Sequence, residues 1–258
     1  MEYLADMEDY RSPDRDVSWI ARKFATTGFY AQLLPHLWKI SGAAKRGDYN
    51  RERWVHDSII VVKGLESVGV YLEIENAAAF QNMESPCVFA SNHMSTMETF
   101  IFPGIIAPFR EIVFIVKESL IKLPVFKHIM LSSNPIVVGR NNPREDFEVV
   151  LRDGQEHLKR NVSVIIFPQG SRSDDFDPKE FNTLGTKLAR RAGVPVIPVA
   201  LKTDAWGNNG LLVKDFGRIY PAKPVRICFG DPVYIEGKGR KEHESIVQFI
   251  AGKLQSWR

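Results

Sequence analysis

The sequence has few of the features that mark extracellular or nucleic-acid-binding proteins. It contains only 2 cysteines, Cys87 and Cys228, and both lie inside apolar stretches without the spacing of a metal site or a disulfide framework. We therefore expect a reducing, cytoplasmic compartment. The 34 basic and 31 acidic residues leave a net charge of only +3, so a nucleic-acid binder that depends on many phosphate contacts is not expected.

Long hydrophobic runs are also absent. The longest uncharged stretch, 24–38, is shorter than the ~20 apolar residues that span a bilayer, so no transmembrane helix is expected. The first 16 residues carry 6 acidic side chains, which is the opposite of a secretory signal, so no signal peptide is expected. The 6 histidines show no H-x-x-x-H or Cys/His spacing, and the sequence therefore predicts no metal site.

The sequence does contain alternating strand-like and helix-like segments. Strands are predicted at 70–75, 87–91, 112–117, 135–138, 162–167, 196–201 and 225–229. Helices are predicted at 95–106, 143–160, 183–192 and 241–257, and the turn-rich segment 204–210 is expected to be a surface loop. This alternation predicts an α/β fold with a mostly parallel central sheet covered by helices, over 70–258.

The first 69 residues have a different pattern. We expect a polar tail over 1–16 and an appendage of N-terminal amphipathic helices over 17–69. Apolar or small residues with helical spacing form one stripe, and Pro35 is expected to kink or split this helix; the stripe consists of Ile20, Phe24, Thr27, Ala31, Leu34 and Trp38. Aromatic and basic residues are mixed here, which suits a membrane surface, although packing on the protein's own domain explains the stripe equally well.

His93 and Glu98 are five positions apart, just after a predicted strand. On a regular helix this spacing turns the chain by about 500°, so the two side chains would point roughly 140° apart and could not meet. Ser95 and Glu98 form a capping-box pattern, however, which predicts a helix start near Ser95 and leaves His93 in the preceding turn. Glu98 could then orient the imidazole of His93 as a general base. The alternative is that Glu98 only caps the helix.

A second group of polar residues follows the predicted strand 162–167. It reads Phe167-Pro168-Gln169-Gly170-Ser171-Arg172-Ser173, a proline and glycine turn that ends in hydroxyl and guanidinium groups. Binding sites collect at such strand ends in open α/β sheets. Ser171 and Ser173 are expected to cap turns or helices rather than to act as nucleophiles.

Together, these two segments resemble the glycerophospholipid acyltransferases typified by lysophosphatidate acyltransferase. Asn92 to Glu98 is similar to the family's N-H-x4-(D/E) block, and 167–173 is similar to its F-P-x-G-(S/T)-R-S block. Two weaker blocks, 135–140 and 194–200, occur in the family's order, and Lys117 matches a recurrent lysine. The resemblance covers about residues 70 to 200. Two positions depart from the usual pattern: Glu98 replaces Asp, and Gln169 replaces Glu, which leaves the identity of the acceptor open.

The resemblance implies a role for each matched residue. His93 would act as the base and Glu98 would hold its ring, while the acceptor hydroxyl attacks the thioester directly. The acceptor phosphate would be bound by Lys117, Arg140 and Arg172. The developing oxyanion would be met by backbone N–H groups near Gly170 and Ser171 or at the helix start after His93, and the sequence does not decide between the two.

The predicted function is therefore an O-acyltransferase in phospholipid biosynthesis. It would move a fatty acyl group from acyl-CoA or an acyl carrier protein to a lysophospholipid or glycerol phosphate, without a cofactor, on the cytoplasmic face of a membrane contacted through the N-terminal helices. Two alternatives stay open. One is an acyltransferase for another lipid acceptor, such as a glycolipid or an amino-acid lipid, and the other is a non-catalytic, acyltransferase-like lipid-binding protein.

Overall fold

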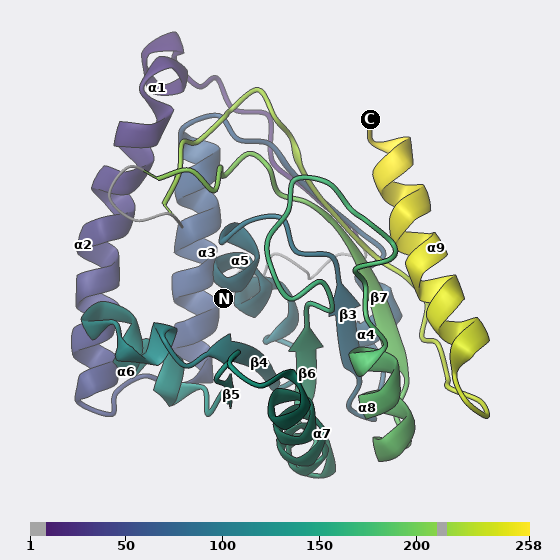
Figure 1. Ribbon diagram of the computed structural model, residues 1–258. Helices are drawn as coiled ribbons and strands as arrows, with labels where there is room; N and C mark the ends of the chain where they lie inside the picture. Colours follow the sequence, from purple (N-terminus) through teal and green to yellow (C-terminus); the bar gives the residue numbers. More distant parts are fainter. Residues whose placement is uncertain (1–8, 211–215) are drawn as a thin grey trace.

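One mostly parallel sheet organises the chain (Figure 1). The computed structural model describes residues 9–210 and 216–258, and within them eight strands lie in the order β1-β2-β8-β7-β3-β6-β4-β5. The strands are β1 (Tyr10–Arg11), β2 (Leu72–Glu75), β3 (Val88–Ser91), β4 (Ile112–Lys117), β5 (Ile136–Val138), β6 (Ser163–Ile166), β7 (Val196–Lys202) and β8 (Val225–Phe229). Only the β1–β2 and β7–β8 pairs are antiparallel. The predicted α/β fold is confirmed.

Helices cover both faces of this sheet. They are α1 (Trp19–Lys23), α2 (Ala25–Lys45), α3 (Arg51–Ser67), α4 (Ala78–Gln81), α5 (Met97–Ile106), η1 (Leu120–Lys122), α6 (Pro124–Ser132), α7 (Pro143–Lys159), α8 (Leu184–Ala192) and α9 (Arg240–Ser256). One hydrophobic cluster joins α2, α3 and α5 to the face that carries Phe89, and a second joins α7, α8 and α9 to the face that carries Val88 and Ala90. Neighbouring residues of a strand thus pack into opposite layers.

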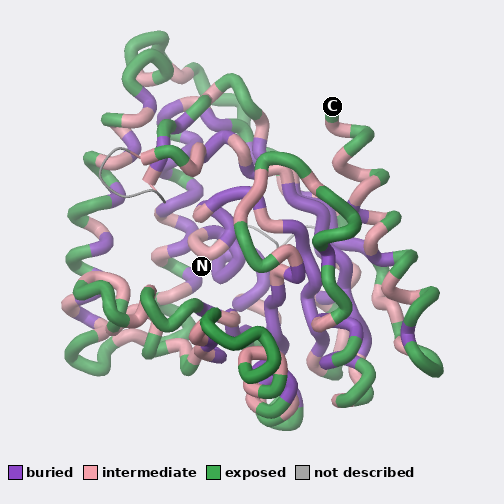
Figure 2. Tube along the Cα trace, viewed as in Figure 1, coloured by how far each residue is buried: buried purple, intermediate pink, exposed green. Residues whose placement is uncertain are grey.

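The central strands β3 and β6 are buried along their length because both of their faces are covered (Figure 2). Strands β3, β4, β5, β6 and β7 run parallel to their neighbours in this part of the sheet. Their carboxyl ends therefore meet at one edge. The two segments with candidate catalytic residues follow β3 and β6, which are direct neighbours.

The structure corrects the prediction for the N-terminal helix in two ways. The break lies at Phe24, between α1 and α2, whereas Pro35 is inside α2 on its exposed side, where water can satisfy the carbonyl that loses its partner. The predicted apolar stripe is the outward one, since Phe24 is 57% and Trp38 is 68% exposed. The buried stripe of α2 contains Phe29, Leu33, Leu37 and Ile40.

The polar tail over 1–16 includes ordered residues, and one further prediction, for the segment 204–210, is wrong. Part of the supposed polar tail is ordered, because Tyr10 and Arg11 pair with β2 and the hydroxyls of Tyr10 and Ser12 donate to the buried Glu66, each at 2.7 Å; residues 1–8 lie outside the described ranges. The segment 204–210 is not a simple surface loop, because Trp206 is fully buried in the core.

The described residues include no helix that is both long enough and apolar enough to cross a membrane.

Candidate active site

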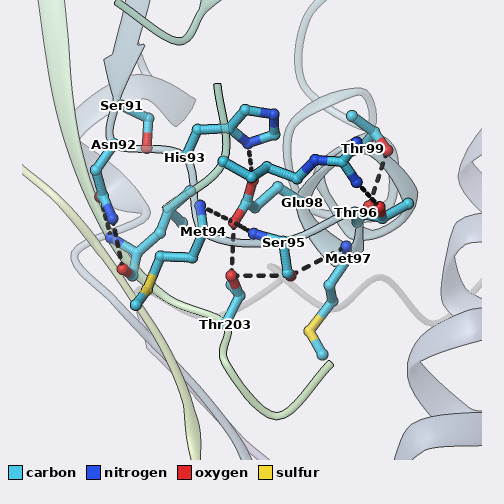
Figure 3. A network of polar contacts seen from close by, with 12 residues as sticks. Ser91, Asn92, His93, Met94, Ser95, Thr96, Met97, Glu98, Thr99 and Thr203 are labelled. Atoms are coloured by element: carbon cyan, nitrogen blue, oxygen red, sulfur yellow. Dashed lines mark hydrogen bonds and ion pairs between the residues drawn. The ribbon is translucent and has the colours of Figure 1, made fainter. Parts of the chain in front are cut away.

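His93 and Glu98 lie in direct contact at the end of β3 (Figure 3). Helix α5 begins at Met97, two residues after the predicted start, so Glu98 lies in its first turn and His93 in the bend before it. Nδ1 of His93 is hydrogen-bonded to Oε2 of Glu98. The Glu98 side chain is fully buried, and the His93 side chain is 15% exposed. One ring edge is thus held inside the protein while part of the imidazole is accessible.

The Glu98 carboxylate is surrounded by hydrogen-bond donors. Oε1 accepts from the N–H groups of Met94 and Ser95, at 2.9 and 2.8 Å, and from the hydroxyl of Thr203, at 2.5 Å. The Ser95 contact is one half of the predicted capping box. Three donors on Oε1 favour the carboxylate anion of Glu98. Oε2 of this anion is then an acceptor, and Nδ1 of His93 is the donor to it. Nε2 is then the imidazole nitrogen that can accept a proton.

Asn92 connects the turn that contains His93 to the sheet. Its side chain is buried and pairs with the backbone of Leu201, donating from Nδ2 to the carbonyl and accepting the N–H at Oδ1, both at 2.8 Å. The amide therefore replaces one more backbone pair between β3 and β7 where β3 ends. It satisfies buried polar groups and fixes the point at which the chain turns toward His93.

The segment after β6 contacts the other side of His93. The ring of Phe167 stacks on the imidazole with a centroid distance of 4.1 Å and an interplanar angle of 16°. Oε1 of Gln169 accepts the N–H of His93 at 3.0 Å, and the N–H of Ser173 donates to the His93 carbonyl at 2.9 Å. Three side-chain and backbone groups from one segment thus fix both the ring and the backbone of His93.

The turn itself is formed by Pro168 to Ser171. The carbonyl of the buried Pro168 accepts a hydrogen bond from Nδ2 of Asn182. Gly170 has φ of +73°, a conformation that favours glycine, and its N–H donates to the Phe167 carbonyl at 3.0 Å. Because this N–H is already used, Gly170 is a turn residue here rather than an oxyanion donor. The Ser171 side chain is exposed.

The three candidate cations follow neighbouring strands at the same edge of the sheet. Arg172, after β6, is partly buried and donates from Nη1 to the Thr96 hydroxyl. Lys117 is the last residue of β4 and is exposed. Arg140 is exposed two residues beyond β5, with φ of +60°, and Asp146 holds this turn by accepting the N–H of Arg140 at 2.8 Å.

These three cations lie at different distances from His93. Strands in a sheet lie ~4.8 Å apart. In the order β3-β6-β4-β5, Arg172 follows the strand next to β3, Lys117 follows the second and Arg140 follows the third, about 14 Å away. Arg172 is therefore best placed to act on the same substrate as His93, and Arg140 is the most remote of the three.

The comparison with protein families agrees with these motifs. The model named "Acyltransferase" matches residues 62–202, which is more than half of the chain and includes both segments around His93. The chain belongs to the acyltransferase family.

Individual acyltransferases support this assignment. The chain is 31% identical over 156 residues to 1-acyl-sn-glycerol-3-phosphate acyltransferase of Pseudomonas aeruginosa, covering 60% of this chain and 57% of that protein. It is 26% identical over 186 residues to the chloroplastic 1-acyl-sn-glycerol-3-phosphate acyltransferase BAT2 of Brassica napus, covering 69% of this chain and 52% of that protein. The matched segments thus span little more than half of either relative.

A solved structure supports the fold of this acyltransferase over nearly its whole length. The crystal structure of the 1-acyl-sn-glycerophosphate (LPA) acyltransferase PlsC from Thermotoga maritima superposes with a TM-score of 0.68, covering 92% of this chain and 97% of that chain. The two sequences are 21% identical, so this likeness concerns the fold.

Sequence reasoning missed several residues that surround the His93–Glu98 pair. Thr203 and Asn208 come from the segment after β7, and Nδ2 of Asn208 donates to the Met94 carbonyl at 2.6 Å. These residues follow β7, which neighbours β3, so the residues after both strands meet at one edge, but the sequence does not specify that these two strands are neighbours. Among the residues that the structure describes, no group of three or more His, Cys, Asp or Glu side chains is placed to hold a metal ion.

Proposed function

We propose that this acyltransferase moves a fatty acyl group from an acyl thioester to the hydroxyl of a lysophosphatidate-type acceptor. The observation that carries the proposal is the His93–Glu98 pair, with one imidazole edge bonded to a buried carboxylate and the ring partly accessible. Arg172 beside it suits an acceptor with a phosphate. The curated relatives are named for acylation of 1-acyl-sn-glycerol-3-phosphate, which is such an acceptor.

In the proposed reaction, Nε2 of His93 takes the proton of the acceptor hydroxyl as its oxygen attacks the thioester carbonyl carbon. Glu98 stabilises the imidazolium that forms, because its negative charge lies against Nδ1. The new C–O ester bond forms, the C–S bond breaks, and the leaving thiolate takes the proton back from His93. Atoms and charges balance without a cofactor. The thiol carrier is either coenzyme A or an acyl carrier protein.

Arg172, Lys117 and Arg140 would bind the phosphate of the acceptor. A guanidinium binds phosphate through two parallel hydrogen bonds, which fixes the orientation of the acceptor hydroxyl as well as its position. The side-chain oxygen of Gln169 accepts the N–H of His93, a role that needs no charge. We assign Gln169 to holding the backbone of His93 rather than to binding the acceptor.

Contact with a lipid surface through α1 and α2 would bring the site to its substrates. Trp19 of α1 is 68% exposed, Leu34 of the outward stripe is 46% exposed, and Nζ of Lys23 lies 5.5 Å from the Trp19 ring centroid. Exposed indoles with nearby cations suit the headgroup region of an anionic membrane. We therefore propose a peripheral protein on the cytoplasmic face of the membrane.

Vesicle sedimentation tests the membrane part. Wild-type protein is expected to sediment with phosphatidylglycerol/phosphatidylcholine vesicles and less with pure phosphatidylcholine, whereas Trp19→Ser/Trp38→Ser should stay in the supernatant. Tyr234→Ser is a matched control, because Tyr234 is 67% exposed but lies outside α1 and α2. Equal sedimentation of all three proteins would argue against docking through these helices.

An acceptor panel tests the enzymatic part. Purified protein is mixed with palmitoyl-CoA or a palmitoyl acyl carrier protein, and free thiol and new ester are followed over time. We expect turnover with lysophosphatidate and little with lysophosphatidylcholine or monoacylglycerol, which lack a terminal phosphate. Preference for an acceptor without phosphate would support the alternative lipid acceptor, and lipid binding without thiol release would support a non-catalytic role.

A further inference from the structure

Thr203 links the end of β7 to the Glu98 carboxylate. It follows Lys202, the last residue of β7, and its side chain is fully buried. The Thr203 hydroxyl donates to Oε1 of Glu98 at 2.5 Å and accepts from the Ser95 hydroxyl at 3.0 Å. The Ser95 bond directs the Thr203 hydrogen toward Glu98. The single donor of the Thr203 hydroxyl is thus used on Glu98, while its oxygen accepts from Ser95 (Figure 3).

The segment after β7 is itself firmly held. The N–H of Trp206 donates to the Thr203 carbonyl at 3.1 Å. The Trp206 ring is fully buried, lies 5.0 Å from the Phe29 ring of α2 and stacks on Phe100 of α5 at 5.5 Å, measured between centroids. Asn208 then bonds to the Met94 carbonyl. The position of Thr203 is therefore set by core packing as well as by contacts with the turn around Met94 and Ser95.

Glu98 needs such an external contact. Of the three donors on Oε1, the N–H groups of Met94 and Ser95 lie in the segment just before α5, close to Glu98 in the sequence. The third donor, Thr203, follows β7. A glutamate has one more rotatable bond than an aspartate, so its carboxylate has more orientations to lose. A donor fixed by β7 selects the orientation in which the second oxygen faces His93.

We propose that Thr203 is a positioning residue, which locks the Glu98 side chain so that Oε2 meets Nδ1 of His93. This inference rests on the proposed acyltransferase function of the His93–Glu98 pair. Thr203 touches neither substrate, and its effect on the reaction passes through Glu98. Its loss should therefore lower kcat and leave acceptor KM nearly unchanged.

Kinetics of Thr203 variants provide the first test. Thr203→Val keeps the shape and removes the hydroxyl, and we expect kcat to fall about 10- to 100-fold, as for a lost hydrogen bond to a charged group, with KM within about twofold. Thr203→Ser restores the hydroxyl and should recover kcat to within about threefold of wild type. Ser95→Ala, which removes the bond that orients Thr203, is a second variant and should lower kcat in the same direction.

Nuclear magnetic resonance provides a test that needs no turnover. In protein labelled with ¹⁵N-histidine, the His93 Nδ1–H proton, assigned by its absence from His93→Gln, should appear far downfield because it is bonded to a carboxylate. Thr203→Val should shift or broaden this resonance, whereas Thr203→Ser should keep it. Retention of the wild-type resonance and wild-type kcat in folded Thr203→Val would overturn the inference.

A double-mutant cycle tests the link to the glutamate. In Glu98→Asp the side chain is one methylene shorter, so its carboxylate should lose the contact with Thr203. Adding Thr203→Val to this variant should therefore lower kcat less than about twofold. An equal loss in both backgrounds would contradict a role through Glu98. If wild-type protein showed no acyl transfer while the resonance still responded to Thr203→Val, the proposed function would fail and the positioning role would stand.

Discussion

The imidazole of His93 lies nearly parallel to the ring of Phe167, with 4.1 Å between the ring centroids. Phe167 in turn stacks on Phe102 of α5 at 6.3 Å. The His93 imidazole is therefore held between Glu98 at its edge and an aromatic ring at its face. This arrangement joins the segments after β3 and β6, which are separate in the sequence, into one site.

Replacing Phe167 by leucine should remove the flat surface on which His93 is oriented. We expect kcat to fall about 2- to 10-fold, in line with the ~0.5–1.5 kcal/mol of an aromatic pair, while acceptor KM changes little. Steady-state kinetics on lysophosphatidate, with circular dichroism as a fold check, measure this. A wild-type kcat in Phe167→Leu would mean that Glu98 alone orients the imidazole.

The charge of Glu98 should matter more than its size. In Glu98→Gln the amide can still accept at its oxygen but donates from nitrogen to Nδ1, which places the His93 proton on Nε2 and removes the base. We expect kcat to fall at least about 10³-fold, and Glu98→Asp to retain more activity than Glu98→Gln. Similar activity in both variants would argue that the carboxylate only caps α5.

The cations should contribute according to their distance from His93. Arg172→Lys keeps the charge but loses the planar fork, so we expect the KM for lysophosphatidate to rise about 10- to 100-fold. The same change at Arg140, two residues beyond β5 and thus the most remote of the three cations, should raise this KM less. Arg144→Lys, at a residue whose side chain is 89% exposed on α7, is the matched control. A larger effect at Arg140 than at Arg172 would require a different acceptor orientation.

The free energy of unfolding is expected to depend on pH through His243. Burial lowers the pKa of this half-buried imidazole, and the bond with the backbone of Phe181 opposes the shift only in part. In the unfolded chain His243 has the ordinary pKa of about 6.5 and binds a proton more readily than in the folded protein. Its contribution to the free energy of unfolding is therefore fully present above about pH 6.5 and is lost as the pH falls below that value. Urea unfolding at pH 7.5, 6.0 and 5.0 should show this decline.

His243→Gln should make the free energy of unfolding depend less on pH over the same range. His56→Gln is the control, because the His56 side chain is 59% exposed. The explanation fails if wild type and His243→Gln lose stability equally between pH 7.5 and 5.0.

The sequence predicted local features, such as strand bounds, better than contacts between residues far apart in the chain. Strands such as β4 and β8 were found at their true bounds, because a strand covered on both faces is a continuous apolar run. The meeting of His93 and Glu98 followed from a helix start encoded within eight residues. The bond between Thr203 and Glu98 spans 105 positions, and no local pattern specifies which strand ends become neighbours.

The N-terminal helix shows a second limit. Phe29, Leu33, Leu37 and Ile40 have the same helical spacing as the stripe chosen from the sequence, and periodicity cannot decide which of two such stripes is buried. The packing of Phe29 against Trp206 decides it. That contact depends on a segment nearly two hundred residues later, which the sequence pattern described as a loop.

Removal of the His93 imidazole tests the central claim most directly. Release of free thiol from palmitoyl-CoA, dependent on lysophosphatidate, should be followed for wild type and for His93→Ala, with equal melting temperatures as evidence that both are folded. We expect at least a 10³-fold loss of kcat, with lysophosphatidate still bound, because the hydroxyl loses its proton acceptor. Transfer at the wild-type rate in folded His93→Ala would contradict the account.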